Sequence, residues 1–254
     1  MRLIFNVTFP SFSRVIRDVS FNHKDRFMQY EILARPAAAV AKLTLDSNES
    51  ITCEVGAMIA MSTGISVETT SGMKGASGGF FKGLKRMFSG ENFFLNHFTA
   101  NQPDQTLIIG PTMLGDIVHH NLRGGSLVIQ GSSWLASDVG IKIDATWQGF
   151  GKAIFSGEGL FWVKATGQGS IFLNSFGAIY EVDVDGEYIV DTGHIVAFED
   201  TLQFKIVKAG ASLIGSFLGG EGLVCKFHGT GKLYCQSHNP PNFGKLLGPN
   251  LKPR

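Results

Sequence analysis

The sequence predicts an all-β fold built from three degenerate copies of one structural unit, packed as a sandwich or barrel with pseudo-threefold character. Three observations support this. The chain of 254 residues holds 32 glycines, nearly twice the usual share, which is typical of many tight turns. Its 21 phenylalanines supply core material. Two short landmarks also recur in the same order along the chain.

The first landmark is an apolar step that begins with Gly or Ser and ends in Ala, at 56–60, 132–136 and 193–197. The second is a Gly-Glu pair that ends at Glu91, Glu158 and Glu221. An apolar run, a Gly or polar turn and a second apolar run follow each glutamate. Because no copy can bury its own apolar face, the three copies are expected to pack together, over about 43–111, 117–183 and 184–238.

The runs in each copy predict hairpins, with turns at 101–104, 166–169 and 229–231. Apolar residues alternate with polar ones at 51–55 and 141–144, which predicts half-buried strands. The connections are too short for the helical crossovers of a parallel sheet.

The domain is expected to span 28–238. Residues 1–27 show no clear period and are interpreted as a disordered arm or a segment outside the native domain. The alternative is an organellar transit peptide, because the segment contains Arg and Ser and few acids. The Pro-rich tail at 239–254 is expected to be mobile.

Charge and cysteine content limit the partners and the compartment. Residues 1–27 carry five basic and two acidic residues, which leaves the rest of the chain with a net charge of −2. A mildly acidic body does not favour a phosphate backbone, so nucleic acid is not the expected partner. Three cysteines do not make a disulfide scaffold, and a reducing, cytoplasmic compartment fits. If residues 1–27 are a transit peptide, the localisation is mitochondrial. No apolar run reaches the length of a membrane-spanning helix.

Two patterns suggest metal sites, and both have a simpler interpretation. Cys225 and Cys235 each precede a histidine by three residues, as in some zinc sites, but the repeat comparison aligns them with core positions Leu95, Trp162, Ile109 and Leu173. Acids at 181, 183, 185 and 187 suggest calcium, but they are interpreted as the solvent face of a strand. Val182 and Val184 then face the core, and a hairpin turn falls at Asp185-Gly186. No metal or other cofactor is predicted.

Catalytic motifs are weak throughout. The Gly-rich segment at 72–83 is not followed by Gly-Lys-Ser or Gly-Lys-Thr, and no Gly-x-Ser-x-Gly elbow occurs. His119-His120 lacks an adjacent nucleophile and the spacing of a metal pair. Glu91, Glu158 and Glu221 are interpreted as equivalent structural turn residues. We therefore expect no catalytic residues and no enzyme activity.

The segment at 72–88 is the candidate interaction surface. It lies in a longer stretch than its counterparts in the other copies, and it is rich in glycine. Its aromatic residues occur at helical spacing, with basic residues between them: Lys74, Phe80, Phe81, Lys82, Lys85 and Arg86. Such a segment suits an anionic membrane surface or a protein partner. The alternative is a short helix that caps the end of the barrel.

Several strings carry a resemblance to a known family: Met28-Gln-Tyr-Glu-Ile, Glu54-Val-Gly-Ala-Met, Gly83-Leu-Lys-Arg-Met-Phe-Ser-Gly-Glu91 and Gly157-Glu-Gly-Leu160. Over about 28–238 the chain resembles the Altered Inheritance of Mitochondria protein twenty-four (mitochondrial biogenesis) family. The resemblance implies a β-sandwich or double-stranded β-helix-like barrel, similar to the tryptophan RNA-binding attenuation protein. It implies no established enzyme activity, and in fungal members an association with the mitochondrial inner membrane.

The expected function is a non-enzymatic scaffold or interaction protein that self-associates through exposed strand edges and associates peripherally with a membrane through 72–88. The alternative is an RNA- or small-ligand-binding module, suggested by the fold resemblance alone.

Overall fold

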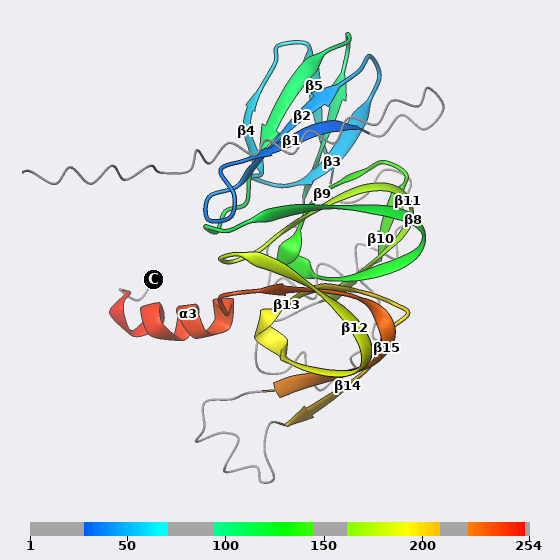
Figure 1. Ribbon diagram of the computed structural model, residues 1–254. Coiled ribbons are helices and arrows are strands. Elements are labelled where there is room, and N and C mark those ends of the chain that lie inside the picture. The colour runs from blue at the N-terminus through cyan, green and yellow to red at the C-terminus, as the bar shows by residue number, and fades with distance from the viewer. Residues whose placement is uncertain (1–27, 71–93, 145–161, 209–222, 252–254) are drawn as a thin grey trace, which may run out of the picture.

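A computed structural model describes residues 28–70, 94–144, 162–208 and 223–251 (Figure 1). The first part holds seven strands: β1 (Gln29–Leu33), β2 (Val40–Leu45), β3 (Ser50–Glu54), β4 (Met58–Met61), β5 (Ile65–Thr70), β6 (Leu95–Ala100) and β7 (Gln105–Ile109). The rest adds β8 (Ile117–Gln130), β9 (Trp134–Asp138), β10 (Ile141–Asp144), β11 (Trp162–Asn174), β12 (Ile179–Asp191), β13 (Ile195–Glu199), β14 (Gln203–Lys208) and β15 (Leu223–Gln236). The prediction of an all-β fold is confirmed.

The strands form two antiparallel sheets. One has the order β1-β2-β7-β4. The other runs β12-β15-β13-β8-β11-β9-β3-β6-β5, with β10 on β11 and β14 on β15. Both orders are open at their ends, so the described strands do not close into a barrel. Figure 1 shows β1–β7 at the top, β8–β11 in the middle and β12–β15 below.

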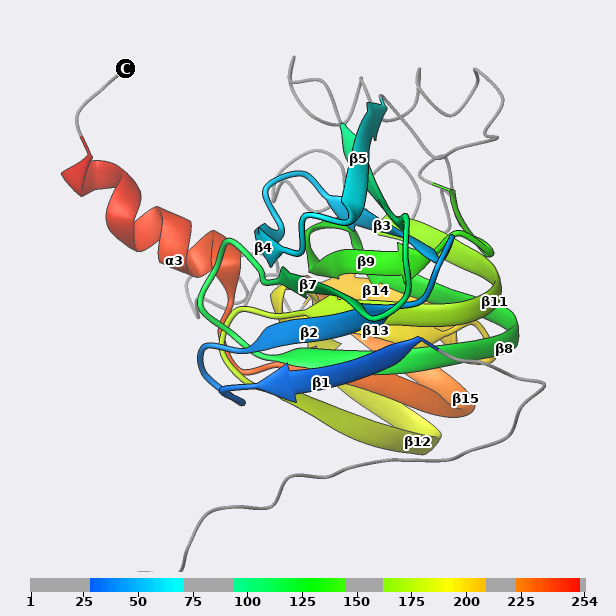
Figure 2. The same ribbon diagram turned by 90° about the horizontal axis from the view of Figure 1, so that it is seen from above.

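Three apolar clusters follow this stack. The upper one lies mainly between β2, β3, β6 and β7, where alternate residues point inward along β2 and β7. The middle cluster is built on β8 and β11, and the lower one on β13 and β15. The strands β1, β2, β8 and β12 lie along one side of the molecule when it is seen from above (Figure 2). The strands predicted at 141–144 and 51–55 are present as β10 and β3. Strand β3 is covered on both faces and not half-buried, because Ile51, Thr52 and Cys53 are all buried.

The predicted turns at 166–169 and 229–231 are wrong. Both lie inside long continuous strands, β11 and β15. Gly167, Gly169 and Gly229 have positive φ, and the register of β11 on β8 shifts at Thr166/Gln168. Glycine at a positive φ produces a bulge or bend without ending the strand. The first predicted turn, at 101–104, does separate two strands, but β6 and β7 lie in different sheets, so the predicted hairpin is wrong there as well.

The predicted hairpin turn at Asp185-Gly186 is wrong for the same reason. Strand β12 runs through it without a break, and Gly186 pairs with Gly229 of β15. Both glycines have positive φ. Two opposed glycines let the pair of strands bend together at one level.

The C-terminal tail contains a helix that the sequence analysis did not predict, α3 (Pro240–Leu247). Asn239 caps it by accepting a hydrogen bond from the Asn242 N–H, and Pro240 and Pro241 occupy the first positions, where proline loses no helical hydrogen bond. The Phe243 ring lies 5.0 Å from the ring of Phe176. Capping and this contact explain an ordered helix where proline content alone suggests mobility.

Candidate functional site: an open hollow on the edge strand β12

The predicted interaction surface lies outside the described residues. This applies to Lys74, Phe80, Phe81, Lys82, Lys85 and Arg86, and also to the repeated glutamates Glu91, Glu158 and Glu221. Their assignments therefore stay predictions. Among the residues that the structure does describe, no helix has the length and apolar character needed to span a bilayer.

The cysteines are core residues. Cys225 and Cys235 are fully buried, and burial raises the pKa of their thiols to about 12 and about 11. A thiol that stays protonated is a poor metal ligand. His228 and His238 are exposed, and the described residues contain no cluster of three or more His, Cys, Asp or Glu placed to hold a metal.

The strand pairings correct one detail of the repeat comparison. Asp191 pairs with Val224, as Gln130 pairs with Trp162 and Glu54 with Leu95. Val224, not Cys225, is therefore the counterpart of Trp162 and Leu95.

The acidic residues of β12 form an ion-paired outer surface. Lys232 Nζ lies 2.7 Å from Glu181 Oε2 and 3.2 Å from Asp183 Oδ1. Lys226 Nζ lies 2.9 Å from Glu187 Oε2 and lowers the pKa of that carboxyl. Val184 is buried and Val182 packs against the lower cluster. Two lysines of β15 thus pair with three of the four acids, as expected for the solvent side of a strand pair, and Asp185 accepts a hydrogen bond from the Thr230 hydroxyl.

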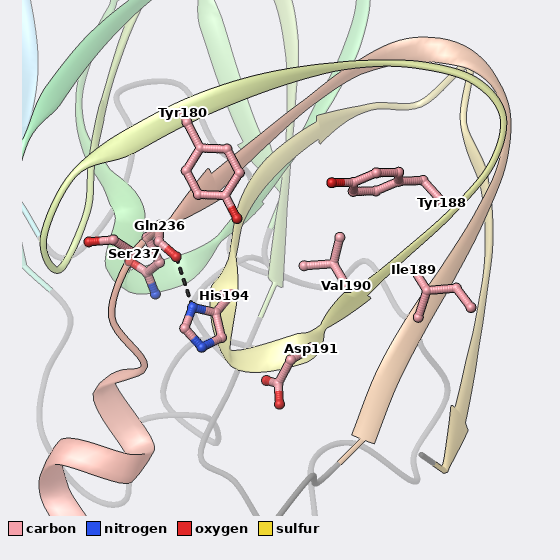
Figure 3. Close-up of a pocket in the computed structure, with 8 residues that line it drawn as sticks. All are labelled: Tyr180, Tyr188, Ile189, Val190, Asp191, His194, Gln236 and Ser237. Atoms are coloured by element: carbon pink, nitrogen blue, oxygen red, sulfur yellow. Dashed lines mark hydrogen bonds between the residues drawn. The ribbon is translucent and has the colours of Figure 1, made fainter. Parts of the chain in front are cut away.

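An open hollow of about 360 Å³ lies beside β12 and the following turn (Figure 3). Side chains from β12 line most of it, and the turn at 192–194 and the end of β15 complete it: Tyr180, Tyr188, Ile189, Val190, Asp191, His194, Gln236 and Ser237. Tyr180, Tyr188 and Ile189 are exposed. The hollow therefore presents both aromatic and apolar side chains and, at one end, a group of polar side chains.

Hydrogen bonds at the polar end hold the turn in place. His194 Nδ1 lies 2.8 Å from the Gln236 carbonyl oxygen. A carbonyl oxygen only accepts, so Nδ1 carries the hydrogen, and a neutral ring presents Nε2 as an acceptor. Asp191 Oδ1 accepts from the Gly193 N–H at 2.8 Å, and Gln236 Nε2 donates to the Gly193 carbonyl at 2.9 Å. These groups fix the backbone at the end of β12, so the hollow keeps its shape.

The strand that lines most of the hollow, β12, lies at the edge of its sheet. Strand β12 pairs with β15 along its whole length, and among the described strands it has no second neighbour. A long unpaired edge with exposed apolar side chains is a template for another strand. Sequence reasoning missed this surface because Tyr180 and Tyr188 share the parity of the buried Val184, which predicts that they face the core.

An ion pair and a group of rings connect β1 and the loop after it with β8 and the residue before it. Arg35 Nε and Nη2 donate to the two oxygens of the buried Asp116 at 2.8 and 2.9 Å. The His119 ring lies 4.3 Å from that of Tyr30 and 5.2 Å from that of Phe172. Burial, with a smaller contribution from His120, lowers the pKa of His119 to about 4. His119 is thus a neutral packing residue at neutral pH.

Comparison with known proteins agrees with this architecture. The family model described as Mitochondrial biogenesis AIM24 matches residues 30–238. The chain belongs to this family. The match begins in β1 and ends two residues after β15, so the AIM24 region contains every described strand and the hollow.

Two streptococcal proteins resemble the chain. An uncharacterized protein of Streptococcus pyogenes serotype M6 is 29% identical over 229 residues, which is 88% of each chain. The crystal structure of a protein from Streptococcus pyogenes superposes with a TM-score of 0.69 and 26% identity, and covers 88% of this chain and 100% of that one. The AIM24 fold described above is thus shared with a solved structure over most of its length.

Proposed function

We propose that this AIM24 protein is a non-enzymatic scaffold or interaction protein whose binding surface is the free edge of β12 together with the hollow beside it. The observation that carries the proposal is the exposure of Tyr180, Tyr188 and Ile189 on a strand that has one unpaired edge. Edge strands of this kind bind extended polypeptide by adding a strand, with main-chain hydrogen bonds giving affinity and side-chain contacts giving specificity.

The shape of the hollow supports a polypeptide partner over a small molecule. Small-molecule sites are concave and bury most of the ligand surface, whereas this hollow is open. Its most prominent groups are two tyrosine rings, which are enriched at protein interfaces because they combine apolar area with a hydroxyl group.

The three-copy organisation is part of the same proposal. In each third of the chain, one or two strands pair with several of the others. Strands β6 and β7 together pair with β2–β5, β11 pairs with β8–β10, and β15 pairs with β12–β14. We interpret these thirds as three copies of one unit. A stack of such units has two different ends, and each end presents the surface that a neighbouring unit would cover.

We also propose that the chain associates peripherally with a membrane through the basic segment at 72–88. Co-sedimentation with anionic liposomes should be salt-sensitive for the intact chain and lost when Lys82, Lys85 and Arg86 are all changed to Glu. If neither protein pellets, the segment has no membrane role and the cap interpretation replaces it.

An RNA- or small-ligand-binding module is the second candidate. Exposed tyrosines can stack on bases, which favours it. The acids of β12 at 181, 183, 185 and 187 lie on the same strand as both tyrosines and oppose a phosphate backbone. Binding of a random RNA pool at physiological salt, lost on Tyr188→Ala, would reverse this ranking.

Photo-cross-linking tests the main proposal. A photo-reactive benzoylphenylalanine replaces Ile189 on β12 or, as the control, the equally exposed Val139 in the turn between β9 and β10. Irradiation of cells that produce the full chain should give a discrete protein adduct, identified by mass spectrometry, from position 189 and none from position 139. No adduct at position 189, or the same adducts from both positions, would contradict the proposal.

A further inference from the structure

We propose that the partner of β12 is β4 of a second copy of the chain, so that copies associate head to tail in a register that the molecule already uses internally. This inference rests on the proposed function and names its partner.

Each internal junction joins the C-terminal end of β3 or β8 to a five-residue strand of the next third, β9 or β13. At the first junction β3 pairs with β9, with Cys53 opposite Ala136 and Thr52 opposite Ser137. At the second junction β8 pairs with β13, with Ile129 opposite Ala197 and Val128 opposite Phe198. Both are antiparallel.

The two junctions use equivalent positions. Strands β3, β8 and β12 end at equivalent pairs: Glu54 pairs with Leu95, Gln130 with Trp162 and Asp191 with Val224. The residues one position earlier are Cys53, Ile129 and Val190.

The short strands are aligned by a shared irregularity. The register shifts between Met58 and Ala60 of β4 where it pairs with β7, between Trp134 and Ala136 of β9 where it pairs with β11, and between Ile195 and Ala197 of β13 where it pairs with β15. The alanine after each shift is therefore equivalent: Ala60, Ala136 and Ala197. In both internal junctions this alanine lies opposite the second-to-last residue of β3 or β8: Ala136 opposite Cys53 and Ala197 opposite Ile129.

Applying the same register to the free ends gives a third junction. It places Ala60 of one copy opposite Val190 of the next, Met61 opposite Ile189 and Ser62 opposite Tyr188. The middle pair of the second internal junction, Val128 and Phe198, is 1% and 0% exposed. Its counterparts at the free ends, Ile189 and Met61, are 59% and 40% exposed. The same positions are buried wherever a neighbouring third is present.

The two ends match in chemistry as well as in register. Strand β4 reads Met-Ile-Ala-Met, and positions 188–190 read Tyr-Ile-Val. Strand β4 and positions 188–190 themselves hold no charged residue and no proline, the residues that usually protect an edge strand from pairing, although Glu187 and Asp191 flank 188–190. β4 lies in the upper third and β12 in the lower third (Figure 1). Different surfaces at opposite ends form a heterologous contact, which builds rings or open chains.

Two single substitutions and their mixture test the proposal with the purified full-length chain. Met61→Lys blocks one end and Ile189→Glu blocks the other. Val139→Glu is the control at an exposed apolar position away from both ends. Molar mass is measured by light scattering after size exclusion, and circular dichroism with thermal melting checks that each variant is folded.

The wild type and Val139→Glu should form concentration-dependent oligomers, and each end variant alone should be a monomer. An equimolar mixture of the two end variants should give a heterodimer, because the intact β12 of the Met61→Lys copy meets the intact β4 of the Ile189→Glu copy. Oligomers that Ile189→Glu abolishes but Met61→Lys does not would show a β12–β12 contact and overturn the inference. A wild type that stays monomeric would also overturn it, while a cross-linked adduct with another protein at position 189 would leave the proposed function standing.

Discussion

His119 shows how a single buried side chain makes stability depend on pH. Its ring packs at a tilt against the rings of Tyr30 and Phe172, and its Nε2 is buried without a hydrogen-bond partner among the described residues. The folded pKa is about 4, against an ordinary value of 6.5. Above pH 6.5 both the folded and the unfolded chain hold a neutral ring. Below it the unfolded chain takes up a proton first, so stability falls between about pH 6.5 and about pH 4.

We expect His119→Phe to remove most of this acid sensitivity while keeping the ring contacts. At pH 4 the variant should exceed the wild type in free energy of unfolding by up to about 3 kcal/mol more than it does at pH 7.5. Urea unfolding across this pH range measures the difference. The control is His228→Gln at an exposed position of β15, which should leave the profile unchanged. A profile unaltered by His119→Phe would contradict the assignment.

The Arg35–Asp116 pair is expected to show strong coupling. Asp116 is 1% exposed and also accepts the Ile117 N–H at 2.9 Å, so removing Arg35 leaves a buried carboxylate with too few partners. Arg35→Gln and Asp116→Asn should each destabilise the fold, and the double variant should lose less than the sum. We expect a coupling energy of about 1–3 kcal/mol. Additive losses in a double-mutant cycle would show that the pair contributes nothing jointly.

The sequence predicted some residue environments and missed others for clear reasons. Burial of Cys225 and Cys235 was predicted because the repeat comparison aligned them with apolar positions of the other copies, and a free cysteine ordinarily behaves as a small apolar residue. His119 was not identified as a packing residue, because its neighbours Tyr30 and Phe172 are distant in sequence. Nothing local marks it as different from His120, whose Nδ1 contacts the Tyr234 hydroxyl at 2.8 Å.

At the scale of elements, glycines decide whether a strand ends or bends. Gly167 of β11 has φ +119°, and a Cβ there would lie 2.2 Å from the Gly140 carbonyl oxygen. Gly124 of β8 has φ +107°, but a Cβ there would meet nothing within 4 Å. An alanine at either position would adopt an unfavourable positive φ, but only at Gly167 would its Cβ also clash with a backbone atom.

Gly167→Ala should therefore destabilise the fold by roughly 3 kcal/mol or more, because the backbone atoms of Gly140 cannot move aside without disturbing the β10–β11 pair. Gly124→Ala should cost less, roughly 1–2 kcal/mol, because it carries only the strain of its positive φ. Chemical denaturation of both variants measures the two losses. Equal losses would mean that close packing at Gly167 is not what requires glycine.

These bends also explain the errors in the predicted turns. Short apolar runs around glycine fit a hairpin and a bent strand equally well, because both need positive φ at the same place. Only the partner strand distinguishes them: β8 accompanies β11 through its bend, and β12 accompanies β15. Local sequence does not contain that information. Helix α3 was missed in a similar way, since its contact with Phe176 lies far away in sequence.

At the scale of the whole molecule, we propose a stack of three similar units with unlike ends. The order of landmarks along the sequence predicted equivalent positions, and the pairings place the alanines of the first landmark at equivalent points. Exposure at the ends was not predictable, because Tyr188 and Ile189 occupy positions that are buried in the other two units. Burial there depends on the presence of a neighbouring unit and not on the local pattern.

Disulfide trapping tests this account most directly. Copies carrying Met61→Cys are mixed with copies carrying Ile189→Cys under mild oxidation, and the native thiols give little background because Cys53, Cys225 and Cys235 are buried. The account predicts a disulfide-linked dimer for this pair and none when Met61→Cys is mixed with Tyr180→Cys, which lies on β12 out of register. Equal trapping of both mixtures, or none in the first, would contradict a head-to-tail junction in the internal register.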